Sequence, residues 1–439
     1  MDHALPRLIG DDVLVPCADG RSRPYVNLDY AASTPVMADV WEAVEAFVPW
    51  YSSVHRGTGY KSQVATDAYE DARTDVAAFV GARQADDVVF VRNTTEAINV
   101  LAAALPAGTR VLSSPVEHHA NMLPWRHHDV SLLPFTRSPE QLLDATEEAL
   151  RAQRYDLVAV TGASNVTGEV WPLTELAALA HHHGARLFVD AAQLAPHRRI
   201  DMAAGGIDFL ALSGHKLYAP LGAGALVGRM PDGLPLLRGG GAIELVTLDD
   251  VIWLDAPERF EAGSPNVIGA VALAAACRRL HGVGVDRIAA QDRLLARQLW
   301  DGLATVPGLE PYTLWPDGSS DRIGVGAFNL DGYRDPLLAA ILSAEYGIGV
   351  RHGCFCAHPL MAELRGYNDA DMVEFAAAIR AGHNPHHPGA VRASIGIGTT
   401  AADIDRLVGA LHEIARYGAR ADYVYDAEHD EYSARALAA

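Results

Sequence analysis

The sequence predicts an α/β protein, with a large, mostly parallel sheet sandwiched by helices and a smaller α+β domain toward the C-terminal end. Between about residues 85 and 230, short apolar runs alternate with helix-like segments, and after about residue 282 longer helices follow. The 439 residues are 49% hydrophobic and 21% charged, enough to bury large cores. We expect a large domain over 25–290 and a small domain, formed by 1–24 and 291–439, that closes over the functional site.

The predicted strands are short runs that are apolar throughout. Strands that are buried on both faces of a parallel sheet have this composition. The runs are Val88–Val91, Arg110–Ser113, Leu157–Thr161, Arg186–Val189, Phe209–Leu212 and Gly224–Val227. Helices are expected between them at Thr95–Ala104 and Leu173–His183, and Gly184 is a good stop signal for the second.

The later part of the chain predicts helices at Asp286–Leu303 and Pro336–Tyr346, with strands at Gly324–Leu330 and Val391–Ile395. The segment Asp369–Gly389 contains prolines, an asparagine and three histidines. Because these residues favour turns, we interpret it as a surface loop with a short helix before it.

Charge and cysteine content exclude several classes of protein. The 55 acidic and 35 basic residues give a net charge of -20, which repels phosphate backbones and disfavours a nucleic-acid partner. No apolar run reaches the roughly 20 residues that span a bilayer, and no secretory signal opens the chain, so we expect no membrane partner and a cytoplasmic location. The cysteines are too few for a disulfide framework, which favours a reducing compartment; they are Cys17, Cys277, Cys354 and Cys356.

Polar side chains follow five successive predicted strands. Ligands of parallel sheets bind beyond the carboxyl ends of the strands, so these positions are site candidates. Asp190 taken alone is equally a magnesium ligand or a helix cap. Lys216, after a buried strand, needs either a carboxylate partner or a chemical task, and a desolvated lysine readily forms a Schiff base. The candidates are Asn93, Thr94, Thr95, Glu96, Glu117, His118, His119, Ser164, Asn165, Asp190, Gln193, Ser213, Gly214, His215 and Lys216.

Nine motifs in register resemble one family, from about residue 27 to 414. They are LDYAAS (28–33), SVHRG (53–57), NTTEAIN (93–99), VEHHANMLPW (116–125), SNVTG (164–168), VDAAQ (189–193), SGHKLY (213–218), RFEAGSPN (259–266) and VRASIG (391–396). The chain resembles the class V aminotransferase-like enzymes of fold type I, and among them the group II cysteine desulfurases and selenocysteine lyases. The resemblance implies pyridoxal 5'-phosphate as the cofactor.

The resemblance also implies roles for individual residues. Lys216 would hold the cofactor as a Schiff base, Asp190 would pair with the pyridine nitrogen, and His118 would stack on the ring. Arg392 would bind the substrate carboxylate with its planar fork. Hydrogen bonds to the phenolic oxygen would come from Gln193 and Asn165. The phosphate would be bound by Thr94, Thr95, Ser213 and His215, with Ser264 reaching across a homodimer interface, and further substrate contacts are assigned to His55 and Arg351.

The segment Arg351–Met361 resembles the desulfurase loop, with Cys356 in the position of the reactive cysteine. Our hypothesis is that Cys356 takes sulfur from L-cysteine as a persulfide, releasing alanine, while Lys216 shuttles protons. The sulfur acceptor stays open between a protein and a small thiol. Cys354 and Phe355 depart from the family pattern, and we interpret Cys354 as a small buried hydrophobe. We expect no metal site, although Cys-Phe-Cys could form half of a zinc site.

Other functions stay open. One is a C–S lyase, aminotransferase or epimerase that acts on a larger amino acid of secondary metabolism. Another is a non-enzymatic binding protein with this fold, against which Lys216, Asp190 and His118 all argue.

Overall fold

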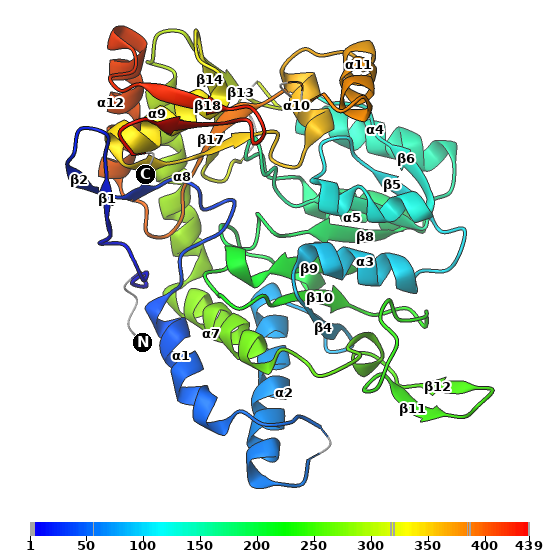
Figure 1. Ribbon diagram of the computed structural model, residues 1–439. Helices are drawn as coiled ribbons and strands as arrows, with labels where there is room; N and C mark the ends of the chain where they lie inside the picture. Colours follow the sequence, from blue (N-terminus) through cyan, green and yellow to red (C-terminus); the bar gives the residue numbers. More distant parts are fainter. Residues whose placement is uncertain are drawn as a thin grey trace. The chain divides into compact units, whose positions relative to one another are not determined.

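The computed structural model describes residues 5–55, 57–316, 318, 321–383, 385 and 388–437 (Figure 1). The chain divides into two compact units. The first contains the residues up to Ile9 together with 33–163 and 171–289, and the second contains 10–32, 164–170 and 290 onward. The chain passes from one unit to the other near the predicted boundary at 290. Residues 25–32 and 164–170, expected in the large domain, fall in the second unit, and the residues up to Ile9, expected in the small domain, fall in the first. Closure of the smaller domain over the site stays a prediction.

The first unit contains the large sheet, with seven strands in the order β4-β10-β9-β8-β7-β5-β6. Strands β9, β8, β7, β5 and β6 are parallel neighbours, and only β10 runs antiparallel, between β4 and β9. The predicted mostly parallel sheet is therefore confirmed. Its strands are β4 (Asp87–Val91), β5 (Arg110–Ser113), β6 (Asp129–Leu132), β7 (Leu157–Thr161), β8 (Arg186–Asp190), β9 (Phe209–Ser213) and β10 (Gly224–Gly228).

The described helices of the first unit include both that the sequence predicted, each within one residue of its expected bounds. They are α1 (Ala38–Phe47), α2 (Tyr60–Val80), α3 (Thr94–Ala104), α4 (Pro139–Ala152), α5 (Leu173–His182), α6 (Met202–Gly205) and α7 (Val267–Val283). The 3-10 turns are Val48–Trp50, His119–Asn121, Pro124–His127, Gly214–Lys216 and Glu258–Phe260. A hairpin of β11 (Ile243–Val246) and β12 (Val251–Trp253) projects away from the large sheet (Figure 1).

The second unit is an α+β structure around an antiparallel sheet in the order β13-β14-β17-β16. These strands are β13 (Leu309–Tyr312), β14 (Val325–Leu330), β16 (Arg351–Gly353) and β17 (Ala390–Ser394). Short pairs are β1 (Leu14–Pro16) with β2 (Ser22–Pro24), β3 (Val26–Asn27) with β15 (Ile348–Gly349), and β18 (Tyr423–Asp426) with β19 (Glu431–Ala434). The helices are α9 (Asp335–Tyr346), α10 (His358–Leu364), α11 (Asp369–Arg380) and α12 (Ala401–Tyr417), and α8 (Val285–Leu303) enters the unit at residue 290.

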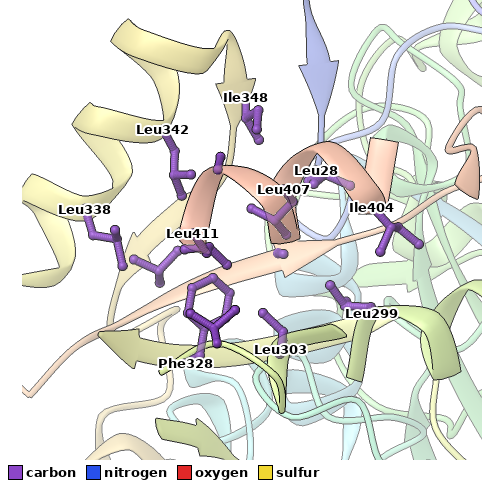
Figure 2. Close-up of a cluster of buried hydrophobic side chains, with 14 of the residues drawn as sticks. Leu28, Leu299, Leu303, Phe328, Leu338, Leu342, Ile348, Ile404, Leu407 and Leu411 are labelled. Atoms are coloured by element: carbon purple, nitrogen blue, oxygen red, sulfur yellow. The ribbon is translucent and has the colours of Figure 1, made fainter. Parts of the chain in front are cut away.

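The core of the second unit lies between its sheet and its helices. Phe328 of β14 meets Leu407 and Leu411 of α12, while Leu299 and Leu303 come from α8 (Figure 2). Each of these side chains is fully buried. Burial of such a side chain contributes about 1.5–3 kcal/mol to the stability of the fold. This cluster therefore stabilises β17 and the strand β16 that pairs with it.

The prediction for the segment Asp369–Gly389 was wrong. The segment Asp369–Gly389 is not a loop throughout, because α11 occupies Asp369–Arg380. The helix begins with a capping box of Asn368 and Asp371, and this local signal outweighs the turn-forming residues further on. None of its side chains is buried, so no apolar periodicity marks it. Asn384, His386 and His387 of the predicted loop lie outside the described residues.

Over the described ranges, no single helix has the length and apolarity of a membrane span, and one bent pair, Val267–Val283 with Val285–Leu303, passes this test only when the two helices are taken together.

Candidate functional site

The carboxyl edge of the seven-stranded sheet carries most of the predicted cofactor-binding residues. Strands β4, β5, β7, β8 and β9 all end at this edge. Asp190 is the last residue of β8, and Ser213 is the last residue of β9. Lys216 follows in the 3-10 turn after β9, Thr94 opens α3 after β4, and His118 lies in the segment after β5. The sheet therefore brings together groups that are up to 122 residues apart in the sequence, from Thr94 to Lys216.

Asp190 is buried at the end of β8, and one of its oxygens accepts a hydrogen bond from the N–H of Ala192 at 3.0 Å. Burial raises the pKa of this carboxyl, and the Lys216 ammonium opposes that change. No helix begins at Asp190, so the side chain is not a helix cap. Within the described residues, no group of three or more histidine, cysteine or acidic side chains could hold a metal ion. Asp190 is therefore a buried carboxylate that interacts with the Lys216 ammonium.

Hydroxyls and a helix N-terminus form a polar corner beside Ser213, where the sequence predicts the phosphate site. The Ser213 hydroxyl accepts from the N–H of Thr94 at 2.8 Å and also hydrogen-bonds the Thr94 hydroxyl at 2.8 Å. Asn93 caps α3 by accepting from the N–H of Glu96, while Thr95 lies exposed in the first turn. The positive end of the helix dipole and these donors favour a phosphate. Burial and the Lys216 ammonium lower the pKa of His215, so its imidazole is neutral at pH 7.

The segment after β5 fixes the tautomer of His118. Nδ1 of His118 accepts from the N–H of Ala120 at 3.0 Å, so the proton of the neutral ring lies on Nε2. The preceding Glu117 is fully buried, and it accepts from the N–H of Thr161 at 3.1 Å and from the Asn121 amide at 2.6 Å. Burial raises the pKa of Glu117 well above its usual value. Glu117 thus anchors the His118 segment to the end of β7.

His55 and Ser264 line a cavity of about 1030 Å³ in the first unit. Nε2 of His55 contacts Glu70 at 2.8 Å, and the His55 backbone lies in the left-handed region, with φ of 66°. The loop of Ser264 is held by Glu261, whose carboxylate binds the Arg73 guanidinium through two contacts of 2.7 and 2.6 Å. Both side chains of this pair are largely buried.

The predicted substrate-binding residues gather in the second unit around Arg392 of β17. Nη1 of Arg392 donates to the Asn165 carbonyl at 2.9 Å, and its guanidinium carbon lies 4.8 Å from the centre of the Phe355 ring. Nη2 lies 3.3 Å from Asp29, and Arg351 lies 3.8 Å from the other oxygen of Asp29. Nε of Arg392 is buried without a hydrogen-bond partner. Burial lowers the pKa of Arg392 to about 10, and Asp29 raises it.

Cys356 is exposed on a strained turn beside Arg392. Phe355 and Cys356 both adopt φ of 54°, in the left-handed region that disfavours residues with a side chain. The Asn165 amide donates to the Phe355 carbonyl at 2.8 Å and so holds this turn. The expectation that Cys354 is a buried hydrophobe was wrong, because its side chain is partly exposed in the loop that carries Cys356.

The candidate residues therefore form two sets, each within its own unit. Ten lie in the first unit, namely His55, Thr94, Thr95, His118, Asp190, Gln193, Ser213, His215, Lys216 and Ser264, and four in the second, namely Asn165, Arg351, Cys356 and Arg392. Sequence reasoning assigned no role to Asp29, Glu117, Glu261 or Phe355, although each lies inside a quoted motif or the cysteine loop. An acidic or aromatic residue directly beside a predicted site residue is a signal that could have found Glu117 and Phe355, whereas Asp29 and Glu261 have no such signal.

The donor set of the first unit fits pyridoxal phosphate. Asp190 supplies a buried carboxylate for a ring nitrogen, Lys216 an amine for an aldehyde, and the corner at Ser213 an anion site for a phosphate. In the second unit, the unpartnered Nε of Arg392 is a buried donor that a carboxylate would satisfy. The two sets together match the chemical groups of this cofactor and of an amino acid.

Comparison with known proteins gives consistent matches along the chain. The family model of the class-V aminotransferases matches residues 26–407. A cysteine desulfurase of Dickeya dadantii is 39% identical over 411 residues, which cover 90% of this chain and 93% of the relative. A probable cysteine desulfurase of Halalkalibacterium halodurans is 36% identical over 78% of this chain and 86% of its own.

Two solved structures are similar in fold and in sequence. A cysteine desulfurase of Thermococcus onnurineus, described as an apo structure, aligns with a TM-score of 0.77 and 32% identity over 89% of this chain and 95% of its own. The cysteine desulfurase CsdA of Escherichia coli, in an S-sulfonic acid form, aligns with a TM-score of 0.74 and 33% identity over 88% of this chain and 94% of its own. The fold type that the sequence motifs implied is confirmed.

Proposed function

This chain belongs to the class-V aminotransferase family, and we propose that it is a cysteine desulfurase that takes sulfur from L-cysteine onto Cys356 and releases alanine. Members of this family use pyridoxal phosphate. The observation that carries the proposal is the set around Arg392 of β17, whose buried, unpartnered donor lies next to the strained turn that exposes Cys356. A carboxylate-binding arginine beside a reactive thiol is what cysteine desulfuration requires.

The cofactor would be held by the first unit. Asp190 would accept from the ring N–H, Lys216 would bond the aldehyde carbon, and His118 would lie on the ring. Thr94, Thr95, Ser213 and His215 would bind the phosphate, while Gln193 and Asn165 would bind the phenolic oxygen. When bound, the cofactor withdraws electrons from the substrate Cα, which makes the Cα proton acidic. Lys216 then removes this proton and returns it.

The substrate would be oriented by Arg392. Its Nε donates to the substrate carboxylate, and the Phe355 ring covers one face of the guanidinium and excludes water from it. Arg351, with a half-exposed side chain, adds positive charge at the entrance, and His55 provides a further polar contact at the cavity of the first unit.

Sulfur transfer would use the Cys356 thiolate. Its sulfur attacks the substrate sulfur, so an S–S bond forms while the C–S bond breaks, and the bonding electrons stay with the carbon fragment. Protonation of that fragment gives alanine, and Cys356 is left as a persulfide for transfer to an acceptor protein. The exposure of Cys356 supports access by both substrate and acceptor.

The test is intact-mass analysis after incubation with L-cysteine, combined with a count of alanine formed. We expect the wild type and Cys354→Ala to gain one sulfur atom and Cys356→Ala to gain none and to lose alanine formation. Alanine formation by Cys356→Ala at the wild-type rate would contradict the assignment of the nucleophile. Pyruvate or a keto acid without any sulfur adduct would favour the lyase or transaminase alternative.

We further propose a homodimer in the cytoplasm. The β11–β12 hairpin exposes Leu245, Leu248 and Ile252, and it continues into the cavity that contains Ser264. An exposed apolar surface of this kind is typical of a protein interface. All four cysteines are free thiols, which supports a reducing compartment.

A further inference from the structure

We propose that Asp29 sets the charge selectivity of the Arg392 site, so that it binds amino acids with one carboxylate and disfavours those with a second. This inference rests on the proposed function, because it takes Arg392 as the residue that binds the substrate carboxylate. Asp29 belongs to the LDYAAS motif, and nothing in its local sequence indicates this role.

The first step is the position of Asp29 between two guanidinium groups. One oxygen lies 3.3 Å from Nη2 of Arg392, and the other lies 3.8 Å from Nη1 of Arg351. Two cations and one anion leave a net charge of +1. That charge matches one substrate carboxylate.

The second step is that Asp29 does not occupy the whole fork of Arg392. It approaches only Nη2, while Nη1 is used by the Asn165 carbonyl. Nε is buried without a hydrogen-bond partner, so a carboxylate that reached it would satisfy a buried donor. Asp29 therefore neutralises part of the charge without contacting Nε.

The third step is burial, which makes the charge count matter. The Arg392 side chain is 4% exposed and that of Asp29 is 22% exposed, so water screens this pair weakly, whereas the Arg351 side chain is 59% exposed and its charge is screened more strongly. Phe355 covers the guanidinium face and displaces further solvent. Once the first carboxylate has bound, the cluster is neutral, and a second carboxylate on the same small ligand finds no compensating charge.

The experiment compares two ligands that differ by one charge and have nearly the same shape, L-aspartate and L-asparagine. Calorimetric titration of the holoenzyme gives a dissociation constant for each ligand in the wild type and in Asp29→Asn. We expect the wild type to bind asparagine more tightly, and Asp29→Asn to shift the ratio toward aspartate on the order of tenfold. A ratio within twofold of the wild-type value in Asp29→Asn would overturn the proposal.

Two further variants separate charge from structure. Asp29→Glu keeps the negative charge and should retain the wild-type ratio; a shift equal to that of Asp29→Asn would overturn the proposal. Asp19→Asn is the matched control in the same unit, because it removes an exposed carboxylate that pairs with Arg23 at 2.7 Å, and it should leave both constants unchanged. A ratio that shifts as much in this control would show a general charge effect and overturn the proposal.

Arg392→Ala distinguishes this inference from the proposed function. If Arg392→Ala bound neither ligand and Asp29→Asn kept the wild-type ratio of the two dissociation constants, Arg392 would still be the carboxylate-binding residue, and the role of Asp29 would be wrong. Undiminished binding of both ligands to Arg392→Ala would instead show that the carboxylate site itself is wrong, and both proposals would fall.

Discussion

At the scale of single residues, the chemistry depends on side chains whose charge or geometry costs free energy. Arg392 is a buried guanidinium with an unpartnered donor, and Phe355 and Cys356 adopt left-handed backbone angles. Such features persist where the surrounding structure compensates for them. Here the Asn165 amide and carbonyl support the turn and the guanidinium together.

The pKa of Arg392 predicts an alkaline limit for substrate binding. Burial lowers this pKa to about 10, and only the protonated guanidinium binds a carboxylate. The contribution of Arg392 to carboxylate binding should therefore be present below about pH 10 and be lost as the pH rises through that value. Since Asp29 raises the pKa of Arg392, the loss in Asp29→Asn should begin at lower pH. The check is the pH dependence of asparagine affinity in both proteins, and identical alkaline limits would contradict the role of Asp29 in this shift.

At the scale of elements, caps and buried ion pairs hold the segments that the sites use. Asn93 caps α3 at the predicted phosphate corner, Asn368 caps α11, and Glu261 anchors the Ser264 loop. Each of these three residues stabilises its segment through a few hydrogen bonds, so a single substitution can test its contribution.

We expect Asn368→Ala to unfold α11 locally without lowering global stability. The capping box satisfies its first backbone N–H groups, the helix buries no side chain, and loss of an N-cap costs about 1 kcal/mol. Hydrogen exchange at residues 369–380 should accelerate, while the denaturation midpoint stays unchanged. Thr400→Ala is the contrasting variant, because it removes the cap of α12, whose apolar face is buried, and should lower the global midpoint. Unchanged exchange in α11 would contradict the capping argument.

We expect Glu261→Gln to destabilise the protein by about 3–5 kcal/mol, because the buried Arg73 guanidinium loses its buried carboxylate partner and keeps only the exposed Glu70. Glu261 also accepts from the N–H of Phe90 and from the Tyr69 hydroxyl, so three partners lose an anionic acceptor. Urea denaturation measures the change. Glu70→Gln is the matched control, since Glu70 contacts the same arginine from an exposed position and should cost less than about 1 kcal/mol. Equal effects of the two variants would contradict the importance of burial.

At the scale of the whole molecule, the chain forms two compact units with separate cores. The first unit contains the sheet with Lys216, and the second contains Arg392 and Cys356. The proposed reaction needs residues of both, and the proposed dimer needs an apolar surface of the first.

The hairpin predicts the oligomeric state. Leu245 is 51% exposed and Ile252 is 50% exposed, so charges placed there would leave the fold intact and disrupt an apolar interface. We expect the double variant Leu245→Asp, Ile252→Asp to sediment as a monomer where the wild type sediments as a dimer. Leu294→Asp, at an exposed position on α8, is the control and should remain dimeric. A variant that stays dimeric would place the interface elsewhere.

The sequence by itself determined the sheet and the identity of most candidate residues. Continuous apolar runs mark strands that are buried on both faces, so Leu157–Thr161 and Arg110–Ser113 were predicted with the bounds that the structure has. The half-exposed β6 was missed because it lacks such a run, and α11 was missed because a helix without a buried face has no apolar period. These signals are local, and local patterns reach only a few residues along the chain.

Only the tertiary structure decided which polar groups meet. Asp29 and Arg392 are 363 residues apart, and they come together because Asp29 bridges to Ser394, the last residue of β17. The same holds for Arg73 with Glu261 and for Asn165 with Phe355. Such contacts depend on strand pairing and on the packing of a complete core, so no spacing in the sequence encodes them. The candidate residues could be predicted from the sequence, whereas the partners that set their charge and orientation depend on the fold.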